Sequence, residues 1–167
     1  MPTEVSLLLS EILPRLPGNP VAARQAKERI LALMESADET VALRAWRLLS
    51  LLPPEMRDPG PTFDPVAWVS ARGGTTAADR VAARRFEVDR LPEAERAAAI
   101  AEKAKEVLAD AEAVPFLIRW LLETNHGDLL LEFPETAFLG DVGVFSARLQ
   151  VLLEEDRLDE AKAWLAR

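Results

Sequence analysis

Alanine and leucine dominate this sequence, with 27 and 26 of its 167 residues, and no other feature constrains its fold as strongly. Both residues form helices readily, because they lose little or no side-chain freedom in a helix. The β-branched and aromatic residues that fill strands are scarce: isoleucine and valine together number 16, and tyrosine is absent. The composition therefore predicts an all-α protein and argues against a β-sandwich or barrel.

Proline, glycine and capping residues divide the chain into about ten helical segments. Asn19-Pro20 and Asp64-Pro65 each place a capping side chain before a proline at the first helical position, where the missing N–H does no harm. Apolar periodicity between such signals predicts helices over about 4–13, 20–35, 41–52, 65–72, 76–88, 92–109, 114–125, 128–133, 142–155 and 157–165. The short turns between them predict antiparallel helical hairpins.

The length fits a single helical domain. Within it we expect N-terminal helices over 1–52, a Pro/Gly-rich connection over 53–74 and repeat-like hairpins over 75–167. Residues 53–65 hold five prolines and little apolar material, so we expect an ordered connection there without a regular element.

A short internal repeat occurs in the last half of the chain. Residues 89–94 read DRLPEA and residues 156–161 read DRLDEA, five identities in six positions at an offset of 67. That offset is close to two periods of 34, which is typical of helical-hairpin repeats. With Phe145 at the large first-helix position and Leu165 at the second-helix anchor, residues 75–167 resemble the tetratricopeptide repeat superfamily. Two departures are Leu149, where that family has glycine, and the hairpin over 114–133, which is out of period.

The resemblance implies a fold of antiparallel hairpins stacked as a short irregular α-solenoid, and the alternative is a nonrepetitive helical bundle. It also implies a concave face formed by the first helix of each hairpin. The matching positions are Ser146, Gln150, Leu117, Leu121, Asp79 and Ala83. Because these residues cannot clamp a terminal carboxylate, as some members of that family do, we expect apolar and neutral polar contacts, or attraction of basic segments.

The net charge of −8 excludes several classes of partner. It opposes approach to nucleic acid or anionic lipid, and no apolar stretch reaches the roughly 20 residues that span a bilayer. The start of the chain lacks the pattern of a secretory signal. We therefore expect a cytoplasmic protein with no nucleic-acid or membrane partner.

No set of residues converges on a catalytic or metal centre. Glu123 and His126 have the spacing of a di-iron ligand pair, but such a site needs a second histidine and His126 is the only one. Gly73-Gly74 could bind an anion, but no P-loop lysine follows, so a plain turn is the better interpretation. We expect no enzymatic activity, no catalytic residue, no cofactor and no metal.

These observations predict a non-catalytic interaction module that binds a peptide or protein partner through Ser146, Gln150 and Trp164. The alternative is a structural or oligomerisation domain of a larger protein. Trp164 lies about 100° around the last helix from Leu165. We expect another copy of the chain, or further sequence, to cover it, which would make a homo-oligomer through the C-terminal helix. An alanine seam over 94–111, including Ala101 and Ala104, is expected where two helices approach closely.

Overall fold

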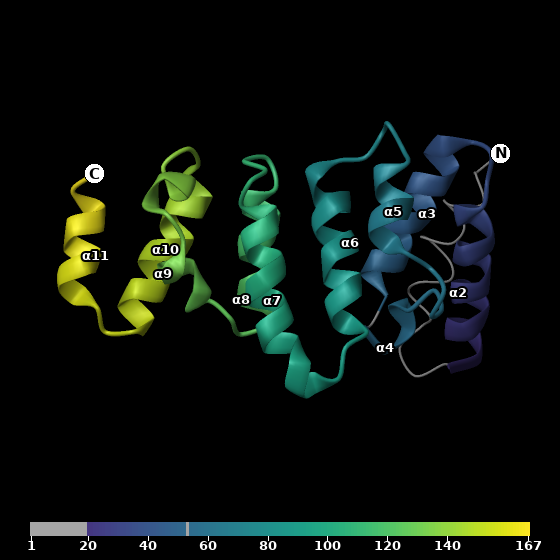
Figure 1. Ribbon diagram of the computed structural model, residues 1–167, viewed down its shortest axis with the longest axis horizontal. Helices are drawn as coiled ribbons and strands as arrows, with labels where there is room; N and C mark the ends of the chain where they lie inside the picture. The colour runs from purple at the N-terminus through teal and green to yellow at the C-terminus, as the bar shows by residue number, and fades with distance from the viewer. Residues whose placement is uncertain (1–19, 53) are drawn as a thin grey trace. The chain divides into compact units, whose positions relative to one another are not determined.

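The computed structural model describes residues 20–52 and 54–167, and these residues are helical with no strand among them. The prediction of an all-α protein is thus confirmed for the described residues, while the expected helix over 4–13 lies outside them. Backbone contacts divide the chain into two compact units, Met1–Arg90 and Leu91–Arg167. Figure 1 labels the helices of both units.

The described helices of the first unit are close to those expected. They are α2 (Pro20–Met34), α3 (Glu39–Leu51), α4 (Pro54–Arg57), α5 (Pro65–Ser70) and α6 (Ala77–Asp89). Asp64 caps α5 by accepting from the amide of Ala67, and Thr76 caps α6 in a reciprocal capping box with Asp79. Helix α2 packs against α3, and α5 packs against α6.

The proline-rich connection is more ordered than the sequence suggested, because its residues 54–57 form α4. Arg90, at the end of α6, holds the rest of the connection in place. Its Nη1 donates to the carbonyl of Phe63 at 2.6 Å, its Nη2 to the carbonyl of Gly60 at 3.0 Å and its Nε to Asp58 at 3.1 Å. The expectation of no element between 53 and 65 was wrong, because Met56 of α4 packs against the core of the first unit and supplies apolar contact that the composition of this segment did not indicate.

An aromatic cluster forms the core of the first unit. Trp46 is fully buried, with ring centroids 4.8 Å from Phe86, 5.6 Å from Trp68 and 6.5 Å from Phe63. Phe86 thereby ties α6 to α3. For this reason α6 belongs to the first unit, although the sequence grouped it with the hairpins over 75–167.

The second unit contains the remaining helices. These are α7 (Glu93–Val107), α8 (Val114–Glu123), α9 (Leu129–Glu132), the 3-10 helix η3 (Glu135–Phe138), α10 (Val142–Glu154) and α11 (Leu158–Leu165). Helix α7 packs on α8, and α10 packs on α8, α9, η3 and α11. Helix α10 is therefore the central helix of this unit.

The helices α8 and α10 end in the same way. Asn125 and Asp156 both adopt left-handed backbone, with φ of 58° and 55°. At each end two backbone bonds close a Schellman motif: His126 to Leu121 and Asn125 to Leu122 after α8, and the equivalent pair after α10. Gly127, two residues after Asn125, does not adopt left-handed backbone. The chain therefore repeats a local geometry at two sites, of which Asp156 begins the second hexapeptide copy and Asn125 lies outside the hexapeptide repeat.

The hexapeptide repeat has different surroundings in its two copies. The second copy connects α10 to α11, which pack together, whereas the unit boundary at Arg90/Leu91 falls inside the first copy. A solenoid built on this repeat remains a prediction, as does the grouping of all 167 residues in one domain.

The expected alanine seam of α7 is shorter than predicted. Ala104 is fully buried, Ala101 is half-buried, and Ala94 and Ala97 are exposed. The partner helix α8 has 10 residues against 15 in α7, so it cannot cover the whole length.

Candidate functional site

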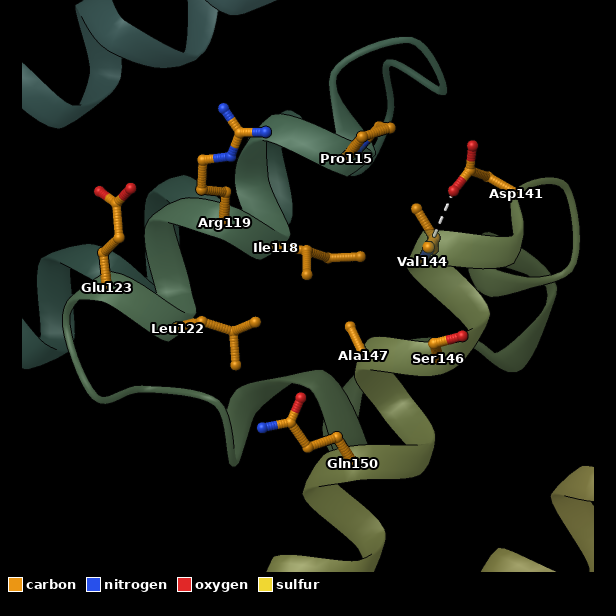
Figure 2. Close-up of a pocket in the computed structure, with 11 residues that line it drawn as sticks. Pro115, Ile118, Arg119, Leu122, Glu123, Asp141, Val144, Ser146, Ala147 and Gln150 are labelled. Atoms are coloured by element: carbon orange, nitrogen blue, oxygen red, sulfur yellow. Dashed lines mark hydrogen bonds between the residues drawn. The ribbon is translucent and has the colours of Figure 1, made fainter.

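A groove of about 540 Å³ lies between α8 and α10 within the second unit (Figure 2). Helix α8 contributes one side of it, with Pro115, Ile118, Arg119, Leu122 and Glu123. Helix α10 and its N-cap contribute the other, with Asp141, Gly143, Val144, Ser146, Ala147 and Gln150. Pro115 lies near Asp141 and Val144 at one end, and Glu123 lies toward the other end.

The floor of the groove is apolar. Ile118, Val144 and Ala147 are 5%, 4% and 8% exposed, and Leu122 is half-buried. In Figure 2 the side chains of Ile118 and Ala147 project into the space between the two helices. The groove thus exposes only the outer edge of packed apolar side chains, which is a surface that a partner can cover without rearranging the core.

The wide apolar stripe of α8 explains how one helix serves both the core and the groove. Leu117 and Leu121 point into the core and are fully buried. Ile118 and Leu122 are each one position further along and lie about 100° around the helix, at the edge of the stripe. A ten-residue helix with apolar residues at all four positions therefore packs inward and lines a groove at once.

The rims of the groove are polar. Arg119 and Glu123 are exposed along the α8 side, one turn apart. On the α10 side, Ser146 donates from Oγ to the carbonyl of Val142 at 2.7 Å, and Gln150 donates from Nε2 to Glu154 at 2.8 Å. The Ser146 hydroxyl hydrogen and one N–H of Gln150 are thus used within α10, while the oxygens Oγ and Oε1 can still accept hydrogen bonds from a partner.

The α10 end of the groove is fixed by its N-cap. Asp141 accepts from the amide of Val144 at 3.0 Å, which satisfies one of the orphan N–H groups of the first turn. Gly143 lies beside that cap, where an added Cβ would come 3.1 Å from the Asp141 carboxylate. The Oδ1 atom of Asp141 is therefore committed to capping α10.

Only some of the residues that the sequence assigned to partner binding line the groove. Ser146 and Gln150 both line the groove and are exposed. Leu117 and Leu121, expected on the concave face, are instead fully buried, because the positions of α8 that line the groove, Ile118 and Leu122, are each one residue further on. Asp79 and Ala83 are also wrong as lining residues. They are 2% and 1% exposed, since α6 turns this face into the first unit.

Trp164 is not a partner-facing residue. It is 2% exposed within the single chain, whereas Leu158 and Leu165 are 51% and 62% exposed. Its indole stacks on Phe145 of α10, meets Phe138 of η3 edge-on at 6.3 Å, and lies 5.2 Å from the guanidinium carbon of Arg148. The prediction that another copy or further sequence covers Trp164 was wrong, because residues of its own unit cover it.

The sequence analysis missed most of the groove floor. Leu117 and Leu121 were assigned to the concave face, and Ile118, Leu122, Val144 and Ala147 were not singled out as lining residues. The width of the apolar stripe on α8 could have indicated the floor. Leu117 with Leu121 and Ile118 with Leu122 form two adjacent apolar pairs, which is more than a single packing partner buries.

A second, smaller cavity of about 280 Å³ lies in the first unit beside α3, and Arg44, Arg47 and Gly74 contribute to it. Arg47 there is engaged by Asp79, with Nη2 to Oδ2 at 2.7 Å. His126 is accounted for locally, since its Nδ1 donates to the carbonyl of Thr124 at 2.7 Å. Among the described residues, no group of three or more histidine and acidic side chains is placed to hold a metal ion.

Comparison of the chain with models of protein families, with curated proteins and with solved structures found no match. In the part of the chain that the structure describes, no helix combines the length and apolar character needed to cross a bilayer.

Proposed function

We propose that the chain is a non-catalytic protein-interaction module and that the groove between α8 and α10 binds a peptide segment of a partner protein. The resemblance of residues 75–167 to tetratricopeptide repeats pointed to the same kind of function and to Ser146 and Gln150 in particular.

One observation carries the proposal: an apolar floor that is partly accessible lies between two helices with polar rims. Ile118 and Leu122 offer apolar contact, while Ser146 and Gln150 offer hydrogen-bond acceptors. This combination suits peptide recognition, in which apolar side chains of the peptide fill the floor and polar groups fix its position. The groove also lies within the roughly 300–1,000 Å³ typical of ligand sites.

The test is to capture partners from the lysate of the source organism with the intact chain and two variants. Gln150→Trp places a large side chain at the groove, where it can cover the apolar floor. Ala163→Trp makes a similar change at an exposed position of α11 outside the groove. Proteins retained by the parent and by Ala163→Trp but lost with Gln150→Trp support the proposal, and partners retained equally by all three refute it.

One observation favours the alternative, a structural or oligomerisation domain. Leu153 of α10 and Leu158 and Leu165 of α11 are 52%, 51% and 62% exposed, so the outer side of this helix pair carries large apolar side chains. If that face rather than the groove binds, Leu158→Ser should change the mass measured by light scattering or abolish partner capture, while Gln150→Trp should change neither.

A further inference from the structure

The net negative charge of the chain comes entirely from the unit that contains the groove. Residues 91–167 contain 16 acidic and eight basic residues, so this unit carries a net charge of −8. Residues 1–90 contain 12 of each and are neutral. Because the groove lies within the second unit, the net negative charge of that unit attracts a cationic partner toward it.

The electrostatic potential also differs between the two ends of the groove. At the end where α8 begins, the carboxylate of Asp141 caps α10, and the positive end of the α10 dipole offsets part of its negative charge. At the opposite end, Glu123 is the last residue of α8, where the helix dipole adds further negative potential. Glu154 lies one turn beyond Gln150 and is held by it at 2.8 Å, so the Gln150 amide orients a second carboxylate there. This end of the groove favours a cation.

From this charge distribution we infer that the groove takes a basic, amphipathic peptide segment. Its apolar side chains cover Ile118, Leu122 and Ala147, and its lysine or arginine side chains pair with Glu123 and Glu154. The inference rests on the proposed function, and it specifies the chemical class of the partner.

Arg119 sets the register of such a segment. Among the described residues that line the groove it is the one cation, and it is exposed on the α8 rim. A partner cation placed beside Arg119 is repelled, while the same cation one helical turn further along meets Glu123. Basic side chains of the partner therefore belong at the Glu123 end, with apolar side chains on the floor.

The test begins with a phage-displayed library of random peptides selected on the intact chain. Peptides that bind the parent and Ala163→Trp, but not Gln150→Trp, are groove-dependent and are then synthesised. Their affinities are measured by fluorescence anisotropy against the parent, against the double variant Glu123→Lys/Glu154→Lys, and against Glu93→Lys/Glu102→Lys. The last pair makes the same change in net charge on exposed positions of α7, outside the groove lining.

We expect groove-dependent peptides to be enriched in lysine and arginine. Their affinity should fall about ten-fold with Glu123→Lys/Glu154→Lys and less than about three-fold with the α7 control, because only the former replaces two local ion pairs by repulsion. Groove-dependent peptides that are neutral or acidic, or that bind both double variants equally, would overturn the inference and leave the proposed function standing. If no selected peptide depends on the groove, both are overturned.

Discussion

The indole of Trp164 stacks on the ring of Phe145, with ring centroids 4.7 Å apart and planes inclined by 18°, and its Nε1 donates to the Phe145 carbonyl at 3.1 Å. One residue of α11 thus makes both an apolar and a polar contact with α10. Trp164 and Ala161 are the buried residues of this eight-residue helix, so the contact helps to attach α11 to the second unit.

Replacing Trp164 should therefore destabilise the second unit strongly. We expect Trp164→Ala to lower the free energy of unfolding by about 3–5 kcal/mol, the usual cost of removing a buried tryptophan. Trp164→Phe keeps most of the apolar contact and loses the hydrogen bond, so it should cost about 1 kcal/mol for that bond plus a smaller packing term. Urea denaturation followed by circular dichroism measures both changes.

Leu165→Ala is the matched control, because Leu165 is the neighbouring residue and is 62% exposed. It should change the free energy of unfolding by less than about 1 kcal/mol. Equal effects of Trp164→Ala and Leu165→Ala would contradict the observed packing of α11.

The orientation of α11 shows where sequence reasoning fails. In a helix of two turns, the apolar periodicity fits two inward faces equally well. One face contains Leu158 and Leu165, and the other contains Ala161 and Trp164. The choice depends on η3 and α10, which supply Phe138, Phe145 and Arg148 around the indole. The positions of these three residues relative to α11 are set by tertiary packing and cannot be obtained from local pattern.

Most other elements were predictable because their ends are encoded locally. Asp64 caps α5 as the sequence predicted, since a cap depends only on residues two or three positions away. The groove was predicted only on its α10 rim, at Ser146 and Gln150. Its floor was missed because the sequence pattern does not show which of the neighbouring residues Leu117 and Ile118 faces the core. That choice depends on how α8 is rotated about its axis in the packed structure.

A buried carboxylate links two helices of the first unit. Asp79 accepts from Nε and Nη2 of Arg47 on α3 at 3.0 and 2.7 Å, and from the amide of Thr76 at 2.8 Å. Asp79→Asn should lower the free energy of unfolding by about 2 kcal/mol, because it breaks a charge-assisted pair and leaves buried polar groups poorly matched. Asp58→Asn, at an exposed acid that pairs with Arg90, should cost less than about 1 kcal/mol by the same urea titration.

The same carboxylate should make stability depend on pH. Burial alone raises the pKa of Asp79, but the hydrogen bonds from Arg47 and Thr76 and the charge of Arg47 outweigh it, so its pKa lies below the ordinary 3.8. A lowered pKa means that the contribution is fully present above the pKa of the unfolded chain and is lost as the pH falls through that of the folded chain. The stability difference between the parent and Asp79→Asn should be constant from neutral pH to about pH 5 and shrink below about pH 4. A difference that grows on acidification would contradict this assignment.

Replacing the buried Arg148 of the second unit with lysine should lower the stability of that unit. Arg148 is 8% exposed, donates from Nη1 to the carbonyls of Leu130 and Phe133 at 2.7 and 3.1 Å, and lies over the rings of Phe138 and Trp164. An ammonium group cannot stack in this way and is more strongly hydrated, so Arg148→Lys should cost about 1–3 kcal/mol in thermal or urea unfolding. Arg119→Lys, on the exposed groove rim, should cost less than about 0.5 kcal/mol.

The two left-handed residues offer a test of the repeated geometry of α8 and α10. At Asn125 and Asp156, with φ of 58° and 55°, a residue with a Cβ adopts a strained backbone conformation. Glycine adopts the same conformation without this strain. Glycine also gives the unfolded chain more freedom, which offsets part of the gain. We expect the glycine variant to be more stable than the alanine variant by about 1 kcal/mol at each of the two positions.

Glu155, next to Asp156, has φ of −85°, and there the order should reverse, with alanine about 0.5–1 kcal/mol more stable than glycine. Six single variants compared by thermal unfolding decide the matter: alanine equal to or better than glycine at either Asn125 or Asp156 would show that this helix does not end in the left-handed conformation.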